Sequence, residues 1–106
     1  MTTRALYVRL ESKPGREQEI EALLRDARSW ALDEPETAAW FAIRIRPSTF
    51  AIFDAFDGAS GRDAHLNGKI AAALKERASD LFANQLDIVE VEVIADKLPA
   101  SDKTRR

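Results

Sequence analysis

Few side chains in this sequence are equipped for chemistry. The 106 residues include one histidine, His65, and no cysteine. The lack of cysteine excludes disulfides, thiolate nucleophiles, iron–sulfur clusters and cysteine-ligated zinc together, and it is compatible with a reducing cytoplasm, where we expect the protein to reside. A chain with one histidine can form a Ser–His–Asp triad, but it cannot build a multi-histidine metal site by itself.

Acidic side chains alternate along the last apolar segment of the chain. Glu90 and Glu92 share one face of that segment, and Asp54 belongs to an earlier strand that can lie nearby. Carboxylates that alternate on a strand are usually solvated or paired with arginine. Because Arg9 and Arg44 occupy the same face, we expect ion pairs here and no metal site.

The charge balance argues against binding to polyanions. The chain has 16 basic and 18 acidic residues. Residues 6–10 (LYVRL) look like the first-strand half of the RNA-recognition signature, but residues 48–52 (STFAI) lack the basic residue and glycine that the third strand of that signature requires. No apolar run approaches the roughly 20 residues of a membrane helix. We therefore expect neither nucleic acid nor a membrane as partner.

The elements that must position these residues can be predicted from periodicity. Alternation of apolar and polar residues predicts strands over residues 5–11, 38–46, 49–57 and 86–95. Apolar residues three and four apart predict one helix that starts near Gly15 and ends before Pro35. They predict a second helix from about Ser60 to Leu81, with a bend around residues 77–80.

This order of elements predicts the fold class. Strand, helix, strand, strand, helix, strand is typical of an α+β ferredoxin-like βαββαβ sandwich, with one antiparallel four-stranded sheet and both helices on one face. The length allows one core, so we expect a single domain over residues 1–98 and a polar C-terminal tail over residues 99–106.

Parity along the strands separates two faces of the predicted sheet. One face is entirely apolar, and we assign it to the helices: Leu6, Val8, Leu10, Phe41, Ile43, Ile45, Ala51, Phe53, Ala55, Val89, Val91 and Val93. The other face stays open and mixes large apolar with charged side chains, chiefly Tyr7, Arg9, Trp40, Arg44, Phe50, Ile52 and Asp54. A patch of this kind favours a partner, and a second copy of the chain is the simplest one. A monomer with a merely amphipathic open face is the alternative.

Three segments carry a family resemblance. The runs PGREQEIEALLRDA, AAWFAIRIRPSTFAIFDAF and AHLNGKIAAAL follow one another in order. In sequence and spacing they resemble the antibiotic-biosynthesis monooxygenase family of the dimeric α/β-barrel superfamily, over residues 4–98. The resemblance implies that two ferredoxin-like halves pack sheet to sheet with their helices outside. It also implies a pocket between helices and sheet in each subunit.

The same resemblance implies a cofactor-independent monooxygenase acting on a small quinol or a phenolic or polyketide aromatic. The substrate anion itself reduces oxygen in that chemistry, so the protein supplies shape, a proton acceptor and electrostatics. His65 is the candidate general base or hydrogen-bond anchor for a phenolic hydroxyl. Val8, Phe41 and Phe53 would form the floor of the pocket, and Gly68 would leave room above it. A partly exposed histidine and a plain packed core are the alternative interpretations.

The same superfamily suggests two other functions. Some superfamily members degrade haem with an Asn on the first strand, a Trp where the second helix begins and a His further along it. This chain has Val8, His65 and about Lys75 at those positions, so haem chemistry is not expected. A non-catalytic homodimer, either structural or binding a small apolar ligand, stays open, because the ligand-binding form needs the same apolar pocket as an oxygenase.

Overall fold

Residues 2–99 are described by a computed structural model, and they contain four strands and three helices. In chain order the elements are β1 (Arg4–Glu11), α1 (Glu17–Leu32), β2 (Thr37–Arg46), β3 (Thr49–Phe56), α2 (Ala59–Leu66), α3 (Lys69–Leu81) and β4 (Asp87–Glu92). The predicted tail falls outside the described residues from position 100 onward.

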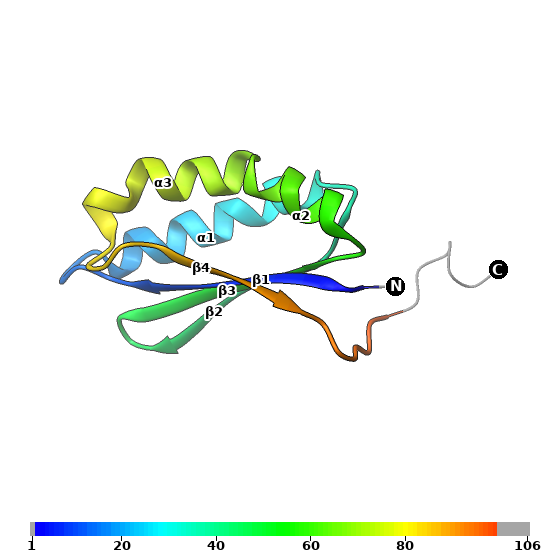
Figure 1. The fold of residues 1–106 in the computed structure, drawn as a ribbon. Helices are drawn as coiled ribbons and strands as arrows, with labels where there is room; N and C mark the ends of the chain where they lie inside the picture. The colour runs from blue at the N-terminus through cyan, green and yellow to red at the C-terminus, as the bar shows by residue number, and fades with distance from the viewer. Residues whose placement is uncertain (1, 100–106) are drawn as a thin grey trace.

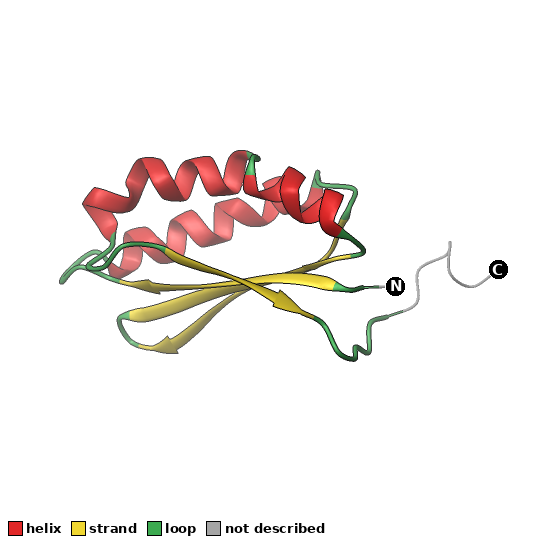
Figure 2. Cartoon of the chain, in the orientation of Figure 1, coloured by secondary structure: helices red, strands yellow, loops and turns green. Residues whose placement is uncertain are grey.

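The strands form one antiparallel sheet in the order β2-β3-β1-β4. Figure 1 shows α1, α2 and α3 stacked on one face of this sheet, while the opposite face is uncovered. The two layers, helices in red and strands in yellow, are separated clearly in Figure 2. The predicted ferredoxin-like α+β fold is therefore confirmed. None of the helices within residues 2–99 has the length and apolar character needed to cross a bilayer.

The core lies between the helix layer and the covered face of the sheet. Its largest contributions come from apolar residues three or four apart on the helices and two apart on the strands: Val8, Leu10, Ile20, Leu24, Phe50, Ile52, Ile70, Leu74 and Leu81. Burial of these side chains is the main stabilising term that holds α1 and α3 against the sheet.

The second helical region is divided at a different place from the one predicted. We expected a bend around residues 77–80, but α3 runs through them, and the break lies at Asn67 and Gly68. Asn67 is the C-cap of α2, and Gly68, with an extended backbone, is the N-cap of α3. The break sets α2 apart as a short helix whose last turn carries His65.

The predicted assignment of the two sheet faces is wrong for three of the four strands. Leu6, Val8 and Leu10 of β1 face the helices as expected. In β3 the residues directly opposite them are Asp54, Ile52 and Phe50, which must share that face, and β2 places Trp40 and Arg44 beside Asp54 and Phe50. Trp40, Arg44, Phe50, Ile52 and Asp54 therefore lie on the helix side instead of the open side. Ile88 and Glu90 of β4 also lie there, opposite Val8 and Leu6.

The open face consequently carries a stripe of exposed apolar side chains. Tyr7 and Arg9 lie on it, together with Phe53, Phe41, Ile43 and Val89. Phe41 is 56% exposed, and Ile43 and Val89 are 43% and 41% exposed. Parity alone did not identify the helix side, because both faces of β2, β3 and β4 carry apolar residues.

Polar groups on the covered face are tolerated because helix residues pair with them. Arg44 contacts Glu21 of α1, Asp54 contacts His65 of α2, and Glu90 contacts Arg62 of α2. A charged residue on a strand therefore does not show that its face is exposed to solvent, because the opposing helix can supply its partner.

Candidate functional site

His65 lies between two carboxylates that come from different parts of the fold. Its Nε2 is 2.8 Å from Oδ2 of Asp54, in the middle of β3, and its Nδ1 is 2.6 Å from Oε1 of Glu34, in the turn after α1. Thr37, at the start of β2, donates its hydroxyl to the same Glu34 oxygen at 2.8 Å. We call Glu34, Asp54 and His65 the acid–histidine cluster.

Two members of the cluster, Asp54 and His65, are buried, and Glu34 is partly exposed. Asp54 is 1% exposed and His65 is 6% exposed. Burial alone would lower the pKa of His65, but the hydrogen bonds and negative charges of Asp54 and Glu34 outweigh it and raise the pKa above its ordinary value. These contacts favour the charged imidazole, in which both ring N–H groups donate to carboxylates.

One oxygen of the cluster has no partner. Oδ1 of Asp54 is buried and accepts no hydrogen bond within residues 2–99. Buried carboxylate oxygens without a partner are rare, because desolvation of a charged group is costly. Oδ1 is the buried oxygen of the cluster that is left to accept a proton or a hydrogen bond from another molecule.

A small cavity of about 30 Å³ adjoins the cluster between the sheet and the helices α2 and α3. Asp54 and His65 form its polar end, and the rest of the lining is apolar: Leu6, Val8, Ile52, Leu66, Ile70, Ala71, Leu74, Leu86 and Ile88. This volume accommodates about one or two water molecules and no aromatic ring system.

The cluster does not resemble a metal site in its geometry. The two carboxylates contact opposite edges of one imidazole ring, so their oxygens do not converge on a common point. Within residues 2–99 there is no group of three or more ligand side chains placed to hold a metal ion.

The predicted pocket residues divide between two places. Val8 lines the cavity beside the cluster. Gly68 lies beside Glu34, since a Cβ built on it would come 3.2 Å from Oε2 of that residue. Phe41 and Phe53 were predicted at the floor of the pocket, and this placement is wrong, because they lie on the open face of the sheet.

Sequence reasoning missed the two carboxylates that surround His65. Glu34 was not among the predicted site residues, and its 31-residue separation from His65 gives no local signal. Asp54 did carry a signal, because it is the one charged residue in the apolar run TFAIFDAF. An acid inside such a strand is seldom buried unless it is paired, and the only histidine of the chain is an obvious partner.

Comparison with solved structures places the chain among known folds. The NE2512 protein of unknown function from Nitrosomonas europaea is 50% identical, with a TM-score of 0.92, and the match covers 95% of this chain and 98% of that one. The chain belongs to the NE2512 family. No protein-family model matches the sequence, and no curated protein matches it either.

More distant structures share the fold of this family. A "putative antibiotic biosynthesis monooxygenase" from Nitrosomonas europaea is 14% identical with a TM-score of 0.77, and the match covers 87% of this chain and 90% of that one. A protein of the same description from Bacteroides thetaiotaomicron is 18% identical with a TM-score of 0.73, covering 93% and 96%. The NE2512 family therefore has the antibiotic-biosynthesis-monooxygenase fold, in agreement with the resemblance found in the sequence.

Proposed function

We propose that this protein is a cytoplasmic, homodimeric monooxygenase that needs no cofactor and oxidises a small quinol or phenolic aromatic beside the acid–histidine cluster. The observation that carries the proposal is that Asp54, whose buried Oδ1 has no partner within residues 2–99, lines an apolar cavity. A buried histidine with a raised pKa beside such a cavity is typical of acid–base sites. The shared fold with proteins described as antibiotic biosynthesis monooxygenases supports the reaction class.

In this proposal Asp54 and His65 have different roles. His65 was predicted as the general base, but both of its ring nitrogens are engaged by carboxylates, which also raise its pKa. Asp54 is the better proton acceptor, since Oδ1 is free to approach a hydroxyl. His65 then acts as a positioning residue, because it fixes the other Asp54 oxygen and offsets the negative charge of the cluster.

The proposed reaction balances without a metal or flavin. With an anthrone as substrate, Asp54 takes a proton from the activated carbon acid, and the resulting carbanion or phenolate gives electrons to O₂. One oxygen atom enters the ring as the new carbonyl, and the other leaves as water together with the two hydrogens of the oxidised carbon. The burial of the cluster keeps solvent away from the anion while it reacts.

Substrate entry requires movement of side chains. The cavity of about 30 Å³ is far below the 300–1,000 Å³ of common ligand pockets, so Leu66, Leu86 and Ile88 must separate to admit a ring system. All three line the cavity and are only partly buried, which makes them the side chains best placed to move.

Oxygen uptake with a panel of naphthoquinols and anthrones tests the oxidation. We expect uptake by the wild type and a rate lower by about 10²- to 10⁴-fold in Asp54→Asn, which keeps the shape but removes the base. Arg77→Gln is the matched surface control and should retain the wild-type rate. Uptake that is absent for every substrate, or unchanged in a folded Asp54→Asn variant, contradicts the proposal.

A non-catalytic dimer is the second candidate function. It is favoured by the very small cavity and by the complete engagement of His65, both of which also suit a buried ion pair with a structural role. In that case no substrate of the panel is oxidised, and the loss of His65 changes stability alone.

The homodimer is supported by the exposed apolar side chains of the open face. Phe41, Ile43, Ile45 and Val89 are each more than 40% exposed, and the helices cannot cover them. A second sheet packed on them would bury the stripe. We expect Phe41→Asp to shift sedimentation equilibrium towards monomer at micromolar concentration. Leu32→Asp, on an exposed leucine of α1, is the control and should not shift it. A monomeric wild type overturns the dimer.

A further inference from the structure

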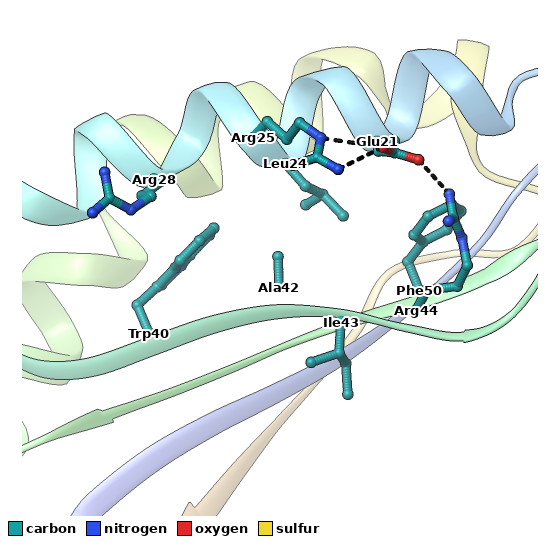
Figure 3. A pocket seen from close by; sticks show the side chains of 9 residues that line it. All are labelled: Glu21, Leu24, Arg25, Arg28, Trp40, Ala42, Ile43, Arg44 and Phe50. Atoms are coloured by element: carbon teal, nitrogen blue, oxygen red, sulfur yellow. Dashed lines mark hydrogen bonds and ion pairs between the residues drawn. The ribbon is translucent and has the colours of Figure 1, made fainter. Parts of the chain in front are cut away.

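A second, larger cavity lies between α1 and the strands β2 and β3, on the same face of the sheet as the acid–histidine cluster. Its volume is about 260 Å³. Figure 3 shows Trp40 and Ala42 pointing from β2 towards α1, with Leu24 facing them from the helix and Phe50 closing one end. These four side chains give the cavity an apolar interior.

Arginines surround the mouth of this cavity. The Glu21 carboxylate accepts hydrogen bonds from both Arg25, at 2.8 Å, and Arg44, at 2.5 Å. Arg28, one turn further along α1 than Arg25, forms no ion pair within residues 2–99. The lining therefore contains three arginines but one glutamate, which pairs with two of them, and it carries a net positive charge.

Two further features indicate a flat, negatively charged occupant. The Arg44 guanidinium lies 4.9 Å from the centroid of the Phe50 ring, so a planar cation covers one aromatic wall. The indole N–H of Trp40 is buried and has no acceptor in the described part of the chain. Hydrogen-bond donors without acceptors, beside an apolar interior, suit a ligand that brings its own acceptor.

We propose that this cavity binds a planar aromatic carboxylate. Its rings would lie among Leu24, Ala42 and Phe50, and its carboxylate would pair with Arg28, because guanidinium and carboxylate form paired charge-assisted hydrogen bonds. The volume suits about one or two fused rings. The inference goes beyond the proposed oxidation, since the cavity lies outside the acid–histidine cluster and binding requires no reaction there.

Titration with naphthoate tests the site, with the uncharged naphthamide as its matched probe. The readout is the Trp40 indole signal in proton–nitrogen correlation spectra, assigned with Trp40→Phe. Trp30 does not line the cavity and serves as the internal reference. We expect the Trp40 signal to shift with naphthoate, and naphthamide to bind at least about tenfold more weakly.

Two variants separate this site from general attraction of anions. Arg28→Gln should weaken naphthoate binding about tenfold and leave naphthamide binding unchanged. Arg77→Gln removes the same charge from α3, away from the cavity, and should alter neither. The proposal is overturned if naphthoate does not shift the Trp40 signal, if both probes bind equally, or if the two variants have the same effect. None of these readouts depends on oxygen uptake, so they are independent of the oxidation test.

Discussion

Replacement of His65 by leucine should expose the energetic role of the acid–histidine cluster. The substitution introduces an apolar side chain of similar size but leaves Asp54, at 1% exposure, without any partner. Glu34 is affected less, because it keeps the Thr37 hydroxyl at 2.8 Å and its side chain is 21% exposed. Most of the destabilisation should therefore come from Asp54.

The size of that loss can be worked out from protonation. The folded variant can avoid an unpaired buried charge by keeping the Asp54 carboxyl group protonated. A carboxyl group with an ordinary value of about 3.9 costs roughly 1.4 kcal/mol per pH unit to keep protonated, so about 4 kcal/mol at pH 7. This agrees with the roughly 3–5 kcal/mol typical of breaking a buried ion pair.

Urea unfolding of the wild type and His65→Leu at several pH values gives the measurement. It must be made at one protein concentration, because the stability of a homodimer depends on concentration. We expect the free energy of unfolding to fall by about 4 kcal/mol near pH 7 and by much less near pH 4 to 5. Adding Asp54→Asn to His65→Leu should restore most of the stability near pH 7. A loss that is independent of pH and is not relieved by Asp54→Asn would refute the reasoning.

Three further predictions concern the same region. The single histidine signal in NMR spectra should titrate above the ordinary value of about 6.5, and Asp54→Asn should lower the pKa of His65, as a pH titration will show. Because the pKa of His65 is raised in the folded state, the stabilisation that its protonation provides is complete below about pH 6.5. This stabilisation declines as the pH rises through the pKa of His65 in the folded protein. Thermal unfolding in matched buffers will measure the decline. Gly61→Ala should cost about 1–3 kcal/mol, since its Cβ would come within 2.9 Å of the Glu36 Cβ, whereas Gly58→Ala meets nothing within 4 Å and should unfold at nearly the wild-type denaturant midpoint.

The fold was predictable because each element has its own periodic signal. Alternation in residues 5–11 and the apolar stripe of the first helix identify β1 and α1 without knowledge of the rest of the molecule. The break at Gly68 was missed because the apolar spacing continues across it. Glycine suits this position because Gly68 lies against Glu34, where a side chain would crowd the carboxylate.

The sheet faces and the site were harder to predict for a common reason. Both faces of β2 and β3 are apolar enough to be buried, so the choice depends on which charges find partners on the helices. Asp54 was assigned to the open side by its parity with Phe50 and Ile52, but it lies on the helix side, where His65 pairs with it. The contact between Asp54 and His65 thus accounts both for the position of Asp54 on the helix side and for the candidate site.

Formation of the cluster and the proposed dimerisation are therefore separable. Glu34, Asp54 and His65 come from one chain, and the contacts among them lie on the helix side of the sheet. The apolar stripe that favours a partner lies on the opposite side, where Phe41 is exposed. A variant that prevents sheet-to-sheet association, such as Phe41→Asp, should consequently leave the pKa of His65 where it is in the wild type. If that pKa moves, the sheet transmits the effect of the partner to the cluster, and the two faces are not independent.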